Sequence, residues 1–222
     1  MGLFDNFKKE TRNLRISENI IYEQVADELN KGIKKEGLWL KAIENSNGLE
    51  HKVKPLYIKY RVSSIKDEIQ YYFDYLQKPS DVFGGMPVCP FLKAELESNK
   101  LLVEIWKPNE FSFNEVWDKF NDSDFDSAII ICLDADGLDW RNVDRKSYQK
   151  FIQKFLKKTE YKALCFSPFE EHTAGGEETR KKSPYFLINI ATREALNQAH
   201  KKLLNTKYFD NFSDKEKTNL KV

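Results

Sequence analysis

The sequence Ala-Ile-Ile-Ile-Cys-Leu at residues 128–133 is followed by Asp-Ala-Asp-Gly at residues 134–137. A short, unbroken apolar run that ends in turn-forming residues is typical of a strand buried on both faces of a sheet. Three more short runs rich in apolar and β-branched residues share this texture and lie at residues 101–106, 163–166 and 185–190. The sequence therefore predicts a sheet of about four buried strands.

Segments with helical periodicity separate most of these strands, and they lie at residues 90–98, 112–120, 145–157 and 192–204. This alternation predicts an open sheet with helices packed on it. The link at residues 168–183 lacks helical periodicity, so we expect the last two strands to pair antiparallel around a polar loop. The predicted fold class is α/β, with a mixed open sheet of about four strands and flanking helices.

A small all-helical module is expected before the sheet. Apolar residues recur every four positions and mark the stripe of a first helix, at Ile21, Val25, Leu29 and Ile33. A short second helix begins near Leu38, and a long third helix covers residues 53–76. The sequence thus divides into a helical module at 1–79, an α/β domain at 80–205 and a polar tail at 206–222. We expect this lysine-rich tail to be loosely docked, with Phe209 and Phe212 as its large anchors.

Composition narrows the class of protein. The 222 residues are 41% hydrophobic, which is ample for a core, and the net charge of +1 argues against a nucleic-acid-binding surface. The sequence holds no apolar run of about 18 residues, so we expect no membrane span. Three cysteines at wide spacing argue against a disulfide framework and favour reduced thiols in the cytoplasm.

The first candidate site is Cys89, in the stretch Gly-Gly-Met-Pro-Val-Cys-Pro-Phe-Leu-Lys at residues 84–93. Proline is favoured at the first helical position, so Pro90 would place the thiol near a helix N-cap. Unpaired amides there favour the thiolate, which would make Cys89 a catalytic nucleophile or a redox centre. The alternative is a structural thiol packed against the core. Cys132 and Cys165 lie within apolar strands, where we expect packed, unreactive thiols.

The second candidate is the pair Asp134 and Asp136 at the end of the central strand. Two carboxylates at a strand end can hold a magnesium ion, and this Asp-x-Asp-Gly element is similar to the one used by phosphotransferases of the haloacid dehalogenase type. Aspartate and glycine after a strand are also ordinary turn residues, and Leu138 stands where that family has threonine. We therefore favour a plain turn over a metal site.

The third candidate is the polar loop before the last strand. Its potential binding residues are His172, Arg180, Ser183 and Tyr185. A loop of this length between strands is often functional, and the basic run that begins at Arg180 could meet a phosphate or carboxylate group. The alternative is a solvated basic run with an exposed histidine.

Several of these motifs together resemble a bacterial domain-of-unknown-function family with Leu-Cys-Pro-Phe and Ser-Pro-Tyr elements. The resemblance spans about residues 84–204 and rests on Val88–Lys93, on the segment ending at Trp140, and on Ser183-Pro184-Tyr185 followed by Arg193-Glu194. The chain has Ser167 at the position of one histidine of that family and Asn189 near the position of another. The resemblance implies a fold unit but no established reaction. Separately, residues 37–42 and 56–61 resemble a helical segment appended to diverse bacterial proteins.

Two classes of function follow from these features. The favoured one is a non-catalytic binding or regulatory unit, in which the tyrosine-rich third helix contacts a protein partner or a second copy of the chain. The alternative is a small-molecule or redox enzyme that uses the Cys89 thiolate, and a minor alternative is magnesium-dependent phosphoryl chemistry at Asp134 and Asp136. The sequence identifies no cofactor.

Overall fold

The structure is a computed structural model that describes residues 14–107, 113–121, 124–134, 140, 143–168, 172–174, 177–180, 183–214 and 217, with backbone alone at 14–17, 172–174 and 177–180. Its helices are α2 (Leu14–Asn30), α3 (Glu36–Asn45), α4 (Glu50–Leu76), α5 (Leu92–Glu97), α6 (Asn114–Asn121), α7 (Arg145–Phe155) and α8 (Arg193–Leu204), with short 3-10 turns η1 (Asp81–Phe83) and η3 (Leu156–Lys158). Within these residues, no helix is both long and apolar enough to cross a membrane.

The central sheet has four strands in the order β3 (Leu101–Trp106), β4 (Ser127–Cys132), β8 (Phe186–Thr192) and β5 (Tyr161–Phe166). β3 and β4 are parallel, whereas β8 is antiparallel to both of its neighbours. The predicted mixed sheet and the antiparallel pairing of the last two strands are therefore confirmed. Two small ribbons accompany it, β1 (Pro79–Ser80) with β2 (Met86–Pro87), and β6 (His172–Ala174) with β7 (Glu177–Arg180).

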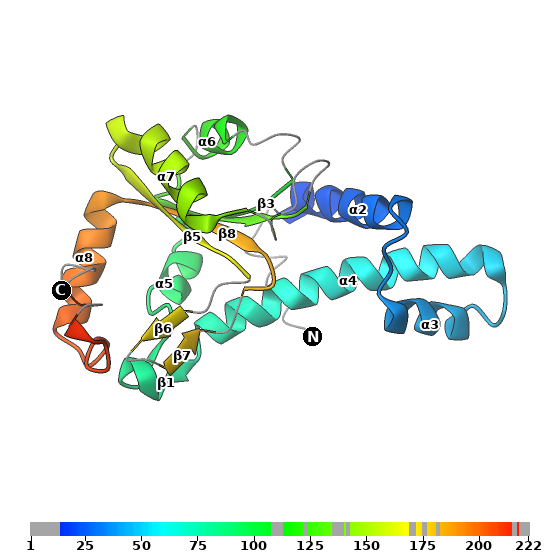
Figure 1. Cartoon of the computed structure of the whole chain (residues 1–222), viewed down its shortest axis with the longest axis horizontal. Helices are drawn as coiled ribbons and strands as arrows, with labels where there is room; N and C mark the ends of the chain where they lie inside the picture. Colours follow the sequence, from blue (N-terminus) through cyan, green and yellow to red (C-terminus); the bar gives the residue numbers. More distant parts are fainter. Residues whose placement is uncertain are drawn as a thin grey trace.

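Each face of the sheet is covered by its own set of helices (Figure 1). Because side chains alternate along a strand, Ile130 and Ile188 face one buried cluster together with residues of α6 and α7, whereas Ile129 and Ile131 face the other. This second cluster includes residues of α2 and α4. The hydrophobic core thus continues across the predicted division near Pro79. That division marks a change from helical periodicity to short apolar runs in the sequence.

One edge of the sheet is closed by side chains of α7. Outward-facing backbone groups of β5 meet residues spaced four apart on that helix: the Cys165 amide donates to Gln149 Oε1 at 3.2 Å, Gln153 Nε2 donates to the Ala163 carbonyl, and Arg145 donates to the Cys165 carbonyl at 3.4 Å. An exposed strand edge invites pairing with another chain, so this stripe of polar side chains protects the sheet from edge-to-edge association.

The segment after α8 docks more tightly than the sequence predicted. Tyr208 and Phe209 are buried, and the Tyr208 hydroxyl donates to the Val88 carbonyl at 2.7 Å. The Asn211 side chain donates to carbonyls of η1. The expectation of a loosely docked tail is therefore wrong for residues 206–212, because aromatic packing on Phe83 anchors this polar segment.

Gly84 makes this docking possible. Its φ of +63° is disfavoured for other residues, and a Cβ added there would lie 2.5 Å from Cβ of Lys207. We expect Gly84→Ala to lower the free energy of unfolding by about 2–4 kcal/mol, because backbone strain and a steric clash add together. Gly85→Ala is the matched control, since Gly85 has a φ of +81° but open space around it. Urea unfolding of both variants measures the difference, and equal losses would contradict the expected clash.

Candidate functional site

A polar cavity lies between the carboxyl end of β4 and the helices α2 and α4. Its volume is about 230 Å³, and its walls come from α2, the middle of α4, and residues 35, 132–134, 140, 168 and 184–186. We call it the edge cavity. Ligands of open α/β sheets commonly bind outside the carboxyl ends of the strands, because loops and helix ends diverge there. Lys107, directly after β3, pairs with Asp27 of α2 and ties this helix to the same edge.

A buried arginine forms the centre of the cavity wall. Arg61 of α4 is 5% exposed. Its Nε and Nη2 donate to the two carboxylate oxygens of Glu28 at 2.9 Å each, which is a bidentate pair between α4 and α2. Its Nη1 donates to Glu68 Oε1 at 3.1 Å. One guanidinium therefore holds two carboxylates from two helices.

Glu68 connects this arginine to the sheet. Its Oε1 also accepts from the Ser64 hydroxyl at 2.9 Å, and its Oε2 accepts from the Tyr185 hydroxyl at 2.8 Å. Tyr185 directly precedes β8 and lies 117 residues from Glu68 in the sequence. The Tyr185 amide donates to the buried Ser183 hydroxyl oxygen at 3.2 Å, which fixes the turn that presents the ring. We call Glu28, Arg61, Ser64, Glu68 and Tyr185 the Arg61 network.

Electrostatics keep the proton on both titratable donors of this network, Arg61 and Tyr185. Burial alone would lower the pKa of Arg61, but the hydrogen bonds and charge of Glu28, together with the charge of Glu68, outweigh burial and hold this pKa above its ordinary value. Burial and the Glu68 carboxylate raise the pKa of Tyr185. The tyrosine is therefore a neutral hydrogen-bond donor at physiological pH and is unsuited to act as a base.

Gln24 of α2 leaves an acceptor unsatisfied beside the edge cavity. The residue lines the cavity and is 8% exposed. Its Nε2 points to Glu28 Oε1 at 3.4 Å, an orientation that a carboxylate neighbour requires of an amide. Its Oε1 is buried and has no hydrogen-bond partner among the described residues. A buried acceptor without a partner costs stability, so the site tolerates this atom at a price in folding free energy.

The structure describes one of the two predicted metal ligands. Asp134 lines the edge cavity, and its Oδ1 accepts from the Trp140 amide at 3.3 Å, as expected for a side chain that stabilises the turn after β4. Asp136 lies outside the described residues. Within the described part of the chain, no group of three potential ligands is placed to hold a metal ion. Magnesium binding at this pair stays a prediction.

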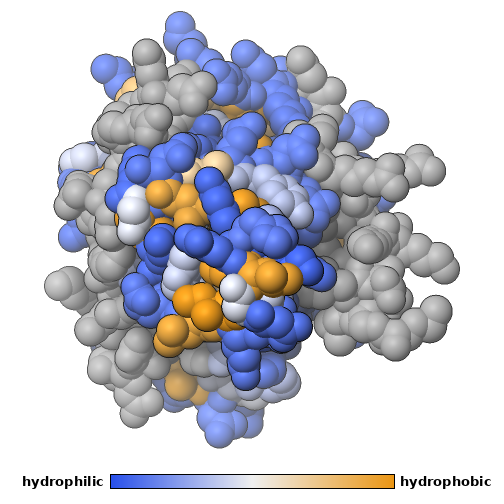
Figure 2. Space-filling model, turned by 90° about the vertical axis from the view of Figure 1, so that its right-hand side faces the viewer, coloured by the Kyte–Doolittle hydropathy of each residue, from blue (hydrophilic) through white to orange (hydrophobic). Residues whose placement is uncertain are grey.

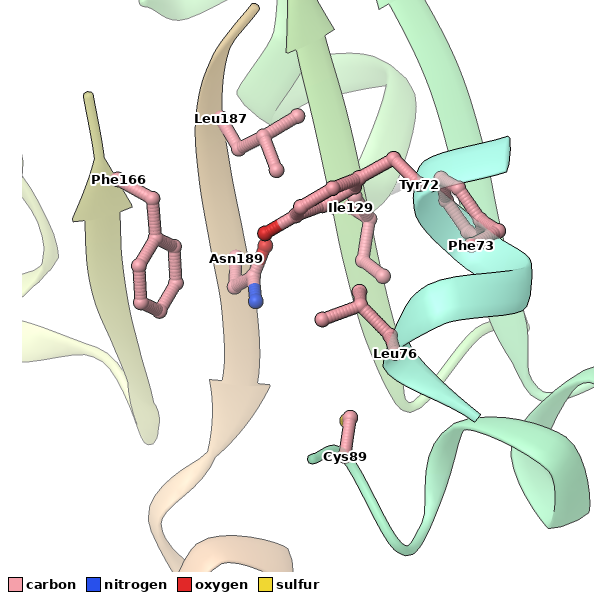
Figure 3. Close-up of a pocket in the computed structure, with 8 residues that line it drawn as sticks. All are labelled: Tyr72, Phe73, Leu76, Cys89, Ile129, Phe166, Leu187 and Asn189. Atoms are coloured by element: carbon pink, nitrogen blue, oxygen red, sulfur yellow. The ribbon is translucent and has the colours of Figure 1, made fainter. Parts of the chain in front are cut away.

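Cys89 does not border the edge cavity. It lines a separate apolar space of about 20 Å³, room for roughly one water molecule, beside Leu76 of α4 and across from Phe166 of β5 (Figure 3). Asn189 Oδ1, also in this wall, has no partner among the described residues. The Cys89 amide donates to the Leu76 carbonyl at 2.9 Å, so the end of α4 anchors the residue.

The expected position of Cys89 at a helix start is wrong. α5 covers only Leu92–Glu97 and its N-cap is Phe91, because the chain makes a turn after its attachment to α4. Cys89 thus stands two residues before the cap, and its thiol chemistry stays a prediction. Cys132 and Cys165 are buried as expected. Burial raises the pKa of Cys132 well above its ordinary range and that of Cys165 to about 12.

The predicted loop residues separate into two groups. Ser183 and Tyr185 meet at the edge cavity, as the preceding contacts show. The backbones of His172 and Arg180 pair with each other at the open end of the β6–β7 ribbon. Their side chains lie outside the described part of the structure, so their binding roles stay predictions.

The tyrosines of α4 are largely core residues. Tyr57 and Tyr72 are buried, and Trp39 of α3 packs edge to face on Tyr57 at 5.4 Å between ring centroids. Tyr71 is 54% exposed. Apolar side chains also gather on the face of the molecule that includes the tip of the α3–α4 hairpin, where Leu40 and Ile43 are exposed (Figure 2). Self-association through these helices stays a prediction that sedimentation of the full chain would test.

Sequence reasoning missed Gln24, Glu28, Arg61 and Glu68 as site residues. Each stands on a helix among other charged and polar residues, a context that is typical of a solvated face. The available signal was the spacing of Arg61, which lies four residues after Tyr57 and four before Ile65, both on the buried side of the long helix. A charged residue inside an apolar stripe requires a buried partner.

Comparison with known proteins adds no assignment to this geometry. No family model matches the chain, and no curated protein or solved structure matches it at a significant level.

Proposed function

We propose that this chain is a non-catalytic binding or regulatory protein whose ligand is a small polar molecule held in the edge cavity. The observation that carries this proposal is the cavity of about 230 Å³ at the carboxyl edge of the parallel strands, with a buried charged network as its wall. Burying such a network is costly, and ligand pockets characteristically combine apolar walls with a few precisely placed polar groups.

The chemistry of the described lining favours binding over catalysis. Cys132 is its cysteine, and burial keeps that thiol protonated. Tyr185 is a neutral donor, Glu28 and Glu68 are engaged by Arg61, and Asp134 accepts from the Trp140 amide. A general base or nucleophile needs a lone pair that is available at working pH. These groups are instead arranged to hold a partner by hydrogen bonds and charge.

The proposed location is the cytoplasm. Its support is that none of the three cysteines, Cys89, Cys132 and Cys165, forms a disulfide.

Nuclear magnetic resonance of the full chain tests the binding proposal. A library of small charged and neutral compounds is screened, and the expected hits shift the Arg61 Nε–H and Trp140 indole N–H signals, both of which belong to the cavity wall. The Trp117 indole N–H, on α6 and outside the cavity lining, is the internal control. The proposal fails if no compound moves the cavity signals at millimolar concentration. Conversion of a bound compound to a product would overturn the non-catalytic assignment.

A further inference from the structure

We propose that the outward face of α7 binds the surface of a membrane that contains anionic lipids. This surface is separate from the edge cavity, because none of its lysines lines that cavity. The inference comes from three properties of the described residues of α7. Its outward face is a row of lysines without ion-pair partners, exposed aromatic rings adjoin that row, and the other polar side chains of the helix are bonded to the sheet.

α7 has a buried side and a basic side. Tyr148, Ile152 and Leu156 are spaced four apart and are buried in the cluster beneath the helix. Positions two residues away from these lie on the opposite side of a helix. Exposed lysines of that side and of the 3-10 turn η3 form what we call the basic face: Lys146, Lys150, Lys154, Lys157 and Lys158. Figure 1 shows α7 on the outside of the molecule, across the sheet from α4.

The basic face is a local excess of charge in a nearly neutral chain. Residues 144–158 hold six cations and one carboxylate, a net charge of +5, whereas the whole chain carries +1 and its remainder therefore −4. The carboxylate is Asp144, which accepts from the amides of Lys146 and Ser147 as the N-cap of α7. Among the described residues, none of the five lysines has an ion-pair partner. Lysines spaced four apart repel one another, and an anionic partner would relieve this repulsion.

Exposed aromatic rings adjoin the basic face. Phe151 is 46% exposed and Phe155 37%, and these residues directly follow Lys150 and Lys154. The Phe155 ring also packs edge to face on Trp117 at 6.0 Å between centroids. Protein surfaces that bind at a membrane interface combine lysines, which attract anionic headgroups, with aromatic or aliphatic side chains that reach the acyl boundary. We therefore place the lysines at the headgroups and the Phe151 ring at the lipid interface.

The remaining polar side chains of α7 favour a lipid surface over a nucleic acid. Arginine and glutamine are side chains that read the edges of bases. Arg145, Gln149 and Gln153 of this helix are instead hydrogen-bonded to the backbone of β5. The outward lysines attract anionic groups without reading a sequence. A membrane requires no such readout, because its headgroups form a continuous anionic surface.

Vesicle co-sedimentation of the full chain tests this inference. One set of vesicles contains phosphatidylcholine alone, and the other contains about one-third phosphatidylglycerol, which is anionic. We expect binding to the anionic vesicles and at least tenfold weaker binding to the neutral ones. Raising the salt concentration from about 0.1 M to about 0.5 M should weaken the anionic binding at least tenfold, because a shorter Debye length screens the lysines.

Two triple variants with the same change in net charge separate the basic face from the charge of the whole chain. The basic-face variant combines Lys146→Gln, Lys150→Gln and Lys154→Gln. It should weaken anionic vesicle binding at least tenfold and leave urea unfolding unchanged, since these side chains have no ion-pair partner to lose. The control variant combines exposed lysines of α4, as Lys52→Gln, Lys54→Gln and Lys59→Gln. Its binding should stay within about twofold of the parent chain.

Phe151→Ala tests the aromatic contribution. It should weaken anionic vesicle binding a few-fold at both salt concentrations, because burial of an apolar ring is not screened by salt. Unchanged binding of this variant would overturn the interfacial role of the ring.

The remaining outcomes decide between partners. Equal binding to neutral and anionic vesicles, or equal losses in the two triple variants, overturns the proposal. Single-stranded and duplex oligonucleotides are titrated in parallel and followed by fluorescence anisotropy. If they bind at lower protein concentration than the anionic vesicles and the basic-face variant abolishes that binding, the face is a nucleic-acid surface and the lipid assignment is wrong. The absence of binding to every probe also overturns it, and none of these results bears on the edge cavity.

Discussion

Arg61→Leu is expected to lower the free energy of unfolding by about 3–5 kcal/mol, the largest effect of any single charge removal in the described structure. The reason is the state of the partners. Without the guanidinium, Glu28 loses a bidentate partner and Glu68 loses one of its donors. The Glu28 side chain is only 12% exposed, so water cannot replace the lost hydrogen bonds fully. A buried carboxylate without a compensating cation is far more costly than a buried ion pair is beneficial.

Urea unfolding at neutral pH, followed by circular dichroism, measures this loss. The triple variant with Glu28→Gln and Glu68→Gln added to Arg61→Leu should recover most of it, because it removes the stranded charges together with the arginine. Lys93→Leu is the matched control, since it breaks an exposed ion pair with Glu97 and should cost under about 1 kcal/mol. A loss below about 1 kcal/mol for Arg61→Leu, or no recovery in the triple variant, would contradict this account.

Phe186→Ala is expected to lower the free energy of unfolding by about 3–5 kcal/mol as well, for a different reason. Phe186 is fully buried at the start of β8. Its ring stacks on Trp140 at 4.6 Å between centroids and meets Tyr148 edge to face at 5.8 Å. Truncation therefore leaves a cavity between the sheet, α7 and the turn after β4, and closely packed surroundings refill such a space only in part.

Thermal and urea unfolding of Phe186→Ala measure this effect. Phe151→Ala is its control, because Phe151 lies on α7 near the same Tyr148 but is 46% exposed. The control should lose under about 1.5 kcal/mol. Since Phe186 and Trp140 also line the edge cavity, the variant should lower the affinity for any ligand that binds there. Equal losses for the two phenylalanine variants would show that packing around Phe186 is not the dominant contribution.

Much of the fold could be predicted because its signals are local. The run at 101–106 is strand β3 at the expected residues, and the runs at 128–133 and 185–190 correspond to β4 and β8 with shifts of one or two residues. The missing helical pattern at 168–183 correctly indicated an antiparallel return to the sheet. Apolar runs and their periodicity reflect which faces of a segment must be buried. They can therefore be recognised in the sequence without knowing which segments pack together.

The candidate site could be predicted only in part. Asp134, Ser183 and Tyr185 stand at strand ends, where polar and turn-forming residues predict a candidate site. Cys89 was also predicted as a site residue but lines a separate apolar space. Its predicted role depended on a helix start at Pro90, and the anchoring of its amide to Leu76 moved that start to Leu92. Helix ends depend on tertiary contacts more than helix interiors do.

The mixed four-stranded sheet, its flanking helices and the helical segment before it follow from local sequence patterns, because hydrophobic burial acts on patterns of neighbouring residues. The buried ion pair between Glu28 and Arg61, 33 residues apart, and its contact with Tyr185 beside the sheet follow instead from how the chain packs in three dimensions. The same packing brings Tyr208, near the chain end, to Val88. Such contacts depend on how helices and strands cross in space. The sequence does not show whether a charged or polar side chain is solvated or bonded to a distant residue.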